Sequence, residues 1–244
     1  MRILITNDDG IGAPCLPLLA DWAKRLGEVV VVAPKVEQSG KSHAIEIYKQ
    51  IEIKEVDLGV SVRAYAMDST PADCVRFAVL GLGEHFDLIL SGINRGFNLG
   101  KDIVYSGTVG AIFEGARLGI PAVALSTDFR DFTHAVSALD EVYDFFVRNE
   151  LLSLGSLYNV NIPIDHKDIR ITRQGDIYYT DEFEPIGNDL YVQKGHAVAQ
   201  IGEDLTLDTD AVRGAHLSIT PLRYDRTNHD VFDRLVGGAG SIDR

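Results

Sequence analysis

The first half of the chain alternates short apolar runs with segments in which apolar residues recur at helical spacing. Runs that are apolar at every position are typical of strands buried on both faces of a parallel sheet. Apolar residues three or four positions apart predict helices that pack on such a sheet. The predicted strands are 2–6, 28–33, 61–67, 87–93 and 121–126, and the predicted helices are 16–26, 71–82, 109–118 and 132–147. Four isoleucines alternate with polar residues and predict a half-exposed pair of strands: Ile45, Ile47, Ile51 and Ile53.

This alternation predicts βαβ units, and hence an α/β fold with a Rossmann-like, three-layer, doubly wound and mostly parallel sheet. After residue 149 the pattern changes, because strand-like runs follow one another with few helical segments between them. Strands are predicted there at 158–162, 168–172, 176–179, 190–193 and 216–220. We therefore expect a single domain with a core over 1–150, a β-rich C-terminal extension over 151–236 and a flexible tail over 237–244.

Composition and charge narrow the classes of function. Hydrophobic residues make up 45% of the 244 residues, which excludes an intrinsically disordered chain. The 23 basic and 36 acidic side chains give a net charge of −13, which argues against a nucleic-acid polymer or an anionic membrane as the main partner. A small phosphorylated substrate stays possible, because a local site can be positive on an acidic protein.

The sequence also bears on location. The two cysteines are too few for a disulfide framework or a cysteine zinc site. No stretch reaches the roughly 18 apolar residues that a membrane span needs. The apolar run at the N-terminus is too short for a signal peptide. We therefore expect a cytoplasmic protein without a membrane partner.

Polar loops follow the predicted parallel strands, at the edge of the sheet where α/β proteins bind their ligands. In an open parallel sheet, ligands lie beyond the carboxyl ends of the strands, near the point where the strand order reverses. Segments rich in Gly, Ser, Asn and Asp occur at 7–10, 38–43, 91–100 and 106–108. We expect these four segments to converge on one edge of the sheet.

The adjacent carboxylates Asp8 and Asp9 are the strongest chemical signal. Two like charges this close repel each other, and a cation or a proton relieves the repulsion. Ser39 and Asn94 would add neutral oxygen ligands, and oxygen ligands favour Mg²⁺, Mn²⁺ or Ca²⁺. The alternative is structural, with one aspartate capping a helix and the other in a turn.

The segment 106–108, Ser-Gly-Thr, precedes a predicted helix. Backbone N–H groups at a helix start can bind a phosphate, although the same residues could be an ordinary N-cap. Lys41 and Arg95 are nearby cations that could hold a phosphate, and His43 is the nearest candidate for a proton donor.

The residues alone disfavour one class of phosphatase. Enzymes that form an aspartyl-phosphate need a nucleophilic aspartate at the position of Asn7, and an amide cannot serve. The sequence also contains no P-loop and no Gly-x-Ser-x-Gly nucleophile elbow.

Seven groups of residues identify a family resemblance. They are 3–11 (Ile-Leu-Ile-Thr-Asn-Asp-Asp-Gly-Ile), 32–34 with 38–40, 70–75, 91–96 with 98–100, 105–111, 218–222, and Asp225 with Thr227. In this order, from residue 1 to about 230, they resemble the SurE family of stationary-phase survival proteins. The sequence departs from residues that are common in this family at four positions, Gln38, Ser69, Ile112 and Phe113. These differences bear on which nucleotide base is preferred and on the shape of the pocket, and none falls on a proposed metal ligand.

The resemblance implies a Rossmann-like fold whose β-rich C-terminal part is used in oligomer formation. It implies a metal-dependent phosphatase acting on nucleoside 5′- and 3′-monophosphates, and in some members on short polyphosphate. One divalent cation per subunit, Mg²⁺ or Mn²⁺ with Ca²⁺ as a possible occupant, would be held by Asp8, Asp9, Ser39 and Asn94. The phosphate pocket would comprise Asn7, Asn98, Ser106, Gly107 and Thr108.

The hypothesis is therefore a divalent-metal-dependent phosphomonoesterase that converts nucleoside monophosphates to nucleoside and phosphate. Asp8, Asp9 and Asn7 are its candidate catalytic residues, and a homodimer or homotetramer is expected. The alternative is a nucleotide-binding regulatory protein without turnover, because the same phosphate pocket would serve a sensor.

Overall fold

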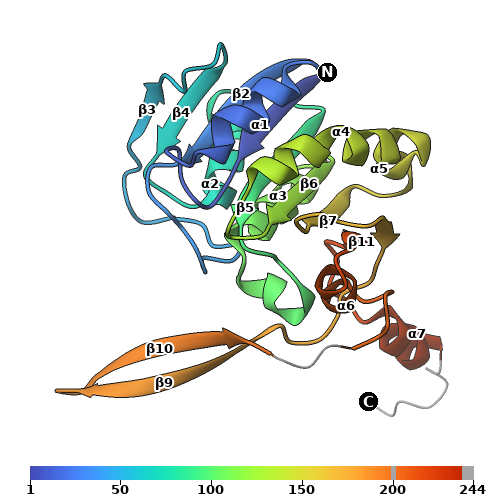
Figure 1. Ribbon diagram of the computed structural model, residues 1–244. Helices are drawn as coiled ribbons and strands as arrows, with labels where there is room; N and C mark the ends of the chain where they lie inside the picture. Colours follow the sequence, from blue (N-terminus) through green and yellow to red (C-terminus); the bar gives the residue numbers. More distant parts are fainter. Residues whose placement is uncertain (199–201, 238–244) are drawn as a thin grey trace.

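The computed structural model describes residues 1–198 and 202–237, and its elements form layers around a central sheet (Figure 1). The strands are β1 (Arg2–Thr6), β2 (Glu28–Pro34), β3 (Ile53–Val56), β4 (Arg63–Met67), β5 (Leu88–Arg95), β6 (Ala122–Thr127), β7 (Leu157–Ile162), β8 (Ile169–Ile171), β9 (Tyr179–Gly187), β10 (Leu190–Ala197) and β11 (Leu217–Pro221). The helices are α1 (Cys15–Ala23), α2 (Pro71–Arg76), α3 (Gly107–Arg117), α4 (Thr133–Arg148), α5 (Leu151–Leu154), α6 (Asp208–Arg213) and α7 (His229–Gly237). A π-helical segment, η1 (Phe77–Gly81), continues α2, and a 3₁₀ helix, η2 (Gly100–Tyr105), precedes α3.

Nine strands of the described residues form one sheet in the order β3-β4-β2-β1-β5-β6-β7-β11-β8. Neighbouring strands are parallel, except that β3 runs antiparallel to β4 and β11 antiparallel to β7. This confirms the predicted α/β, mostly parallel sheet with a β-rich C-terminal part. Strand β1 pairs with β2 on one side and β5 on the other, so the order reverses at β1. The carboxyl ends of these three strands therefore mark the expected ligand edge.

Helices cover both faces of the sheet (Figure 1). Alternate residues of β1 point to opposite faces, so Ile3 and Ile5 pack with α1 and α4 while Leu4 packs with α2 and α3. An apolar cavity of about 310 Å³ lies between α1, α4 and the strands β5 and β6, and none of the predicted site residues lines it. The described part of the chain has no helix that is long and apolar enough to cross a membrane.

Most predicted elements of the core are confirmed, with ends shifted by a few residues. Helix α2 begins at Pro71 because the Thr70 hydroxyl accepts the Asp73 N–H at 3.2 Å, as an N-cap does. Helix α1 ends at Ala23, three residues before its predicted end. Residues 238–244 of the predicted tail lie outside the described residues, and residue 237 ends α7.

The predicted pair of strands over residues 45–53 is wrong in its first part. Residues 45–51 are not in a strand, and only β3 forms. Carboxylates take the backbone donors that a strand would use: the Glu46 N–H donates to Asp73 at 2.7 Å, and the Tyr48 N–H donates to the Glu46 side chain at 2.9 Å. Ile45 and Ile47 are consequently exposed.

The predicted strand over 176–179 is also wrong, since β9 begins at Tyr179. The N–H groups of Tyr178 and Tyr179 donate to the Asp102 carboxylate at 2.8 and 2.7 Å, which fixes this stretch against η2. The sequence pattern also missed η2, α5, α6 and α7.

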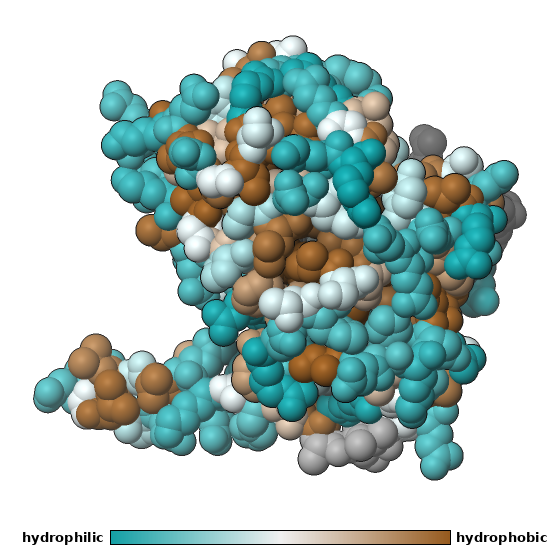
Figure 2. All heavy atoms as spheres, turned by 45° about the horizontal axis from the view of Figure 1, so that its top comes forward, coloured by the Kyte–Doolittle hydropathy of each residue, from teal (hydrophilic) through white to brown (hydrophobic). Residues whose placement is uncertain are grey.

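Strands β9 and β10 form a separate antiparallel hairpin that extends away from the body of the molecule (Figure 1). Its turn residues Asn188 and Asp189 both have positive φ, as a type I′ hairpin turn requires. Phe183 and Tyr191 are on one face of the hairpin and are more than 60% exposed. Figure 2 shows apolar side chains gathered on this arm.

Candidate active site at the carboxyl edge of the sheet

The turn after β1 is closed by Asn7. The fully buried Asn7 side chain accepts the Gly10 N–H at 3.1 Å and donates to the Gly10 carbonyl at 3.0 Å. Gly10 has a φ of +94°, a conformation that glycine adopts without strain. Asn7 therefore uses both ends of its side chain to fix the turn that carries Asp8 and Asp9. Its predicted contact with phosphate stays a prediction.

Asp8 is buried against the start of α3. Its carboxylate accepts the Thr108 N–H at 3.1 Å and the Thr108 hydroxyl at 2.5 Å. Burial raises the pKa of Asp8, and the hydrogen bonds from Thr108 offset part of this rise. A Cβ at position 107 would lie 2.9 Å from the Cβ of Asp8, so Gly107 allows this close approach. The donors of Thr108, which the sequence assigned to a phosphate, contact a carboxylate in this structure.

Ser106 is the N-cap of α3. Its hydroxyl accepts the Val109 N–H at 3.1 Å, so the capping alternative is confirmed. An anion-binding role at the same helix start stays a prediction.

Asp9 lies beside Asp8 and is less deeply buried. Burial, followed by the negative charge of Asp8, raises the pKa of Asp9 to about 6. The backbone N–H of Arg95, at the end of β5, donates to Asp9 at 3.2 Å. The pKa values of both neighbouring carboxylates are raised. A cation bound between them would offset the cost of burying their charges and the repulsion between them.

The loop after β2 and the carboxyl end of β5 bring the other predicted ligands to this turn. The Gln38 N–H donates to the Asp8 carbonyl at 2.7 Å, which places the exposed Ser39 next to the turn. Asn94 precedes the Arg95 that binds Asp9, and its amide nitrogen donates to the Gly96 carbonyl at 2.8 Å. The side-chain oxygen is thus the atom that Asn94 can offer to a cation.

Asn98 is anchored to the sheet by its backbone. Its N–H donates to Asn161 at 2.9 Å, and its carbonyl accepts the side-chain amides of Asn159 at 2.8 Å and Asn161 at 2.9 Å. Its own amide nitrogen donates to Ser126 at 2.8 Å. Sequence reasoning missed Asn159 and Asn161, although two asparagines in an otherwise apolar strand were an available signal.

The C-terminal extension supports the same loop. The buried carboxylate of Asp208, in α6, accepts the N–H groups of Gly100 at 3.1 Å and Gly175 at 2.8 Å. Gln174 also donates to the Gly100 carbonyl at 2.9 Å. The loop that carries Asn98 is therefore fixed from both parts of the chain.

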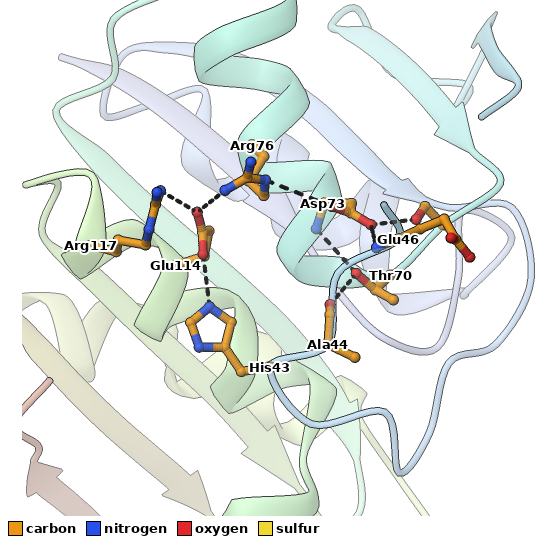
Figure 3. Close-up of polar contacts among 9 residues, drawn as sticks. His43, Ala44, Glu46, Thr70, Asp73, Arg76, Glu114 and Arg117 are labelled. Atoms are coloured by element: carbon orange, nitrogen blue, oxygen red, sulfur yellow. Dashed lines mark hydrogen bonds and ion pairs between the residues drawn. The ribbon is translucent and has the colours of Figure 1, made fainter. Parts of the chain in front are cut away.

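Two buried carboxylates hold the loop that follows Ser39 (Figure 3). The ring of His43 points toward Glu114 and lies 2.8 Å from it. Arg76 and Arg117 each approach Glu114 at 3.1 Å. Although burial raises the pKa of Glu114, hydrogen bonds from His43 and Arg76 hold it below its ordinary value. His43 is therefore engaged in fixing the loop, and its role as proton donor has no support from its contacts.

The second buried carboxylate is Asp73, in α2. It accepts the Glu46 N–H at 2.7 Å and the Ser69 hydroxyl at 2.5 Å (Figure 3). The Thr70 hydroxyl donates to the Ala44 carbonyl at 2.7 Å. The loop between β2 and β3 is thus fixed on α2 and α3. The two candidate phosphate cations, Lys41 and Arg95, are exposed.

The donors at this edge are oxygens. Two carboxylates, one hydroxyl and one amide oxygen suit a hard divalent cation with few protein ligands. The raised pKa values of the buried Asp8 and of Asp9 fit such a cation. Among the described residues, no group of three or more His, Cys, Asp or Glu side chains could hold a metal, so the neutral oxygens would have to contribute.

Comparison with known proteins agrees with this arrangement. Residues 3–181 match the family described as "Survival protein SurE". The chain is 38% identical to the 5′-nucleotidase SurE of Caldanaerobacter subterraneus subsp. tengcongensis, with 96% of this chain and 95% of that protein covered. It is 39% identical to the 5′-nucleotidase SurE of Acinetobacter baumannii, with 98% and 100% covered.

A solved structure shows the same fold. The SurE protein of Aquifex aeolicus superposes with a TM-score of 0.81 at 34% sequence identity, and the match covers 98% of this chain and 100% of that one. The similarity therefore includes the β-rich extension as well as the parallel core. Together, the profile match and the near full-length relatives show that this chain belongs to the SurE family of survival proteins.

Proposed function

We propose that this chain is a divalent-cation-dependent phosphomonoesterase that hydrolyses nucleoside 5′-monophosphates to nucleoside and phosphate. The observation that carries the proposal is the pair of adjacent carboxylates where the strand order reverses. Asp8 is buried against the start of α3, and the pKa of Asp9 is raised to about 6. Relatives that cover nearly the whole chain are named 5′-nucleotidase SurE, which supports this substrate class.

Asp8, Asp9, Ser39 and Asn94 would hold the cation, Mg²⁺ or Mn²⁺ with Ca²⁺ as a possible occupant, one per subunit. When bound, such a cation would act as a Lewis acid on a phosphate oxygen and would lower the pKa of a bound water molecule. Asp9 is the more accessible of the two carboxylates. We therefore assign to Asp9 the role of orienting the attacking water.

The start of α3 would stabilise charge on the phosphate. Gly107 and Thr108 present backbone N–H groups there, and Asn7 and Asn98 lie in the adjoining loops. The Ser106 N–H donates to the Ile103 carbonyl at 3.2 Å, so Ser106 would contribute the hydrogen of its hydroxyl. Since Thr108 donates to Asp8 in this structure, its donors would have to be shared with the phosphate or transferred to it. Hydrolysis of 3′-monophosphates and of short polyphosphate is part of the proposal, because both present the same terminal phosphate.

We also propose that the chain forms a homodimer or homotetramer. The β9–β10 hairpin supports this, because a two-stranded hairpin is marginally stable alone and its apolar face is exposed.

The proposed activity is tested by phosphate release. The protein is stripped with chelator, and Mg²⁺, Mn²⁺ or Ca²⁺ is added singly with nucleoside 5′- and 3′-monophosphates, tripolyphosphate and a sugar phosphate. Metal-restored hydrolysis of the nucleotides is the expected result. Nucleotide binding without release under any metal would instead indicate the regulatory, non-catalytic alternative.

A further inference from the structure

The hydroxyl of Ser39 has a carboxylate partner of its own. Ser39 Oγ lies 2.7 Å from Glu37 Oε1. An ionised carboxylate only accepts hydrogen bonds, so the Ser39 hydroxyl donates its single hydrogen to Glu37. Neither the family resemblance nor the proposed ligand set assigns a role to Glu37.

This direction of donation matters for a cation ligand. A neutral hydroxyl binds a cation through a lone pair, and its hydrogen must then point elsewhere. A carboxylate that accepts the hydrogen orients the lone pairs and makes the oxygen a better donor, as partners of metal ligands do in general.

The segment that carries Glu37 is fixed against the turn after β1. A Cβ at Gly10 would lie 3.3 Å from the backbone nitrogen of Glu37, and the next residue, Gln38, donates its N–H to the Asp8 carbonyl at 2.7 Å. Glu37 therefore approaches the site from the side of Ser39.

We propose that Glu37 is a positioning residue of the cation site: it accepts the Ser39 hydrogen and leaves the lone pairs of that hydroxyl free for the cation. The inference rests on the proposed function, because it needs a cation between Asp8, Asp9 and Ser39.

A competing explanation is that Glu37 acts through its charge alone. Replacement by glutamine removes the charge but keeps a side-chain oxygen that can accept the Ser39 hydrogen. Replacement by alanine removes both. The two variants therefore separate hydrogen-bond acceptance from charge.

The test is Mn²⁺ binding to the full-length, chelator-stripped protein without substrate, with free Mn²⁺ measured by electron paramagnetic resonance. Glu37→Ala is expected to raise the Kd by about 10- to 100-fold, the usual cost of losing a partner of a metal ligand. Glu37→Gln is expected to recover most of the affinity. Glu55→Ala, which removes an exposed carboxylate from β3, is the control and should leave the Kd unchanged.

A second arm uses Ser39→Ala. Because Glu37 acts through Ser39, Glu37→Ala should have little further effect in that background. An equal loss with Gln and Ala, or a full loss in the Ser39→Ala background, would show a charge effect and overturn the inference. An unchanged Kd in Glu37→Ala would also overturn it, while leaving the proposed function intact. A wild-type protein that binds no Mn²⁺ would refute the cation site and, with it, the role of Glu37.

Discussion

The carboxyl edge of the parallel sheet and the β9–β10 hairpin are opposite in character. At the edge, polar side chains are buried and bonded within the chain: Asp8 to Thr108, Asn98 to Asn159 and Asn161. On the hairpin, apolar side chains such as Phe183 and Tyr191 point into solvent. The first region leaves two carboxylates with raised pKa values, and the second leaves apolar surface without a partner in the described residues.

The difference indicates which kind of binding partner would stabilise each region. A small cation would relieve the electrostatic cost at Asp8 and Asp9. Only a large apolar surface, such as that of another protein molecule, would cover the hairpin. Substitutions in one region should therefore leave the property of the other unchanged, and three experiments test this separation.

The largest effect is expected for Asp8→Asn. The variant removes a charge from the proposed cation site and sets an amide opposite the donors of Thr108. Metal-dependent phosphate release should fall by on the order of 100-fold or more. The matched control is Asp189→Asn at the hairpin tip, which should retain activity. Full activity of Asp8→Asn in the phosphate-release assay would contradict the cation assignment.

A second experiment addresses the hairpin. Phe183→Glu places a charge on its apolar face, which should weaken assembly and lower the mass measured by sedimentation velocity. Thr180→Glu adds the same charge on the opposite face, at the end of the hairpin away from the exposed Ile186 and Val192, and should not change the mass. A wild-type chain that sediments as a monomer would be evidence against assembly through this arm.

The smallest effect is expected from the titration of Asp9 in the cation-free protein. Its pKa is about 6 in the folded state against an ordinary 3.8, so the folded state takes up a proton that the unfolded state does not. Stability therefore rises as the pH falls from 7 toward 4.5, and this gain is absent in Asp9→Asn. In chelator, the Tm of the wild type relative to Asp9→Asn should increase by roughly a few degrees between pH 7 and 5. A difference in Tm that does not depend on pH would show that Asp9 has an ordinary pKa.

The sequence predicted the parallel core well because its central strands, β1 and β2, are largely apolar runs. The runs at β1 and β2 are buried on both faces, and only such a sheet accommodates them. The adjacency of Asp8 and Asp9 is likewise a local feature that the sequence displays directly. Their placement at a reversal of strand order followed from the alternation of strands and helices.

Other features depend on partners far apart in the chain, and local patterns do not contain them. Glu114 meets His43 from 71 residues away, and Asp208 meets Gly100 from 108 residues away. The segment 45–51 has the alternation of a strand, but Asp73 takes one of its backbone donors from another element. Helix α6 is short, with little periodicity to recognise.

The position of Asp208 also limits how the length of this chain can change. Strand β11 and the carboxylate of Asp208 both come from the last quarter of the sequence, yet one completes the main sheet and the other fixes Gly100. Truncation near residue 150 would also remove β7, the strand that pairs with β6, and it would release the Asn98 loop, so the core cannot be excised as a smaller working unit. Insertions at the Asn188–Asp189 turn would avoid both constraints. Length variation among related chains should accordingly concentrate at the hairpin tip.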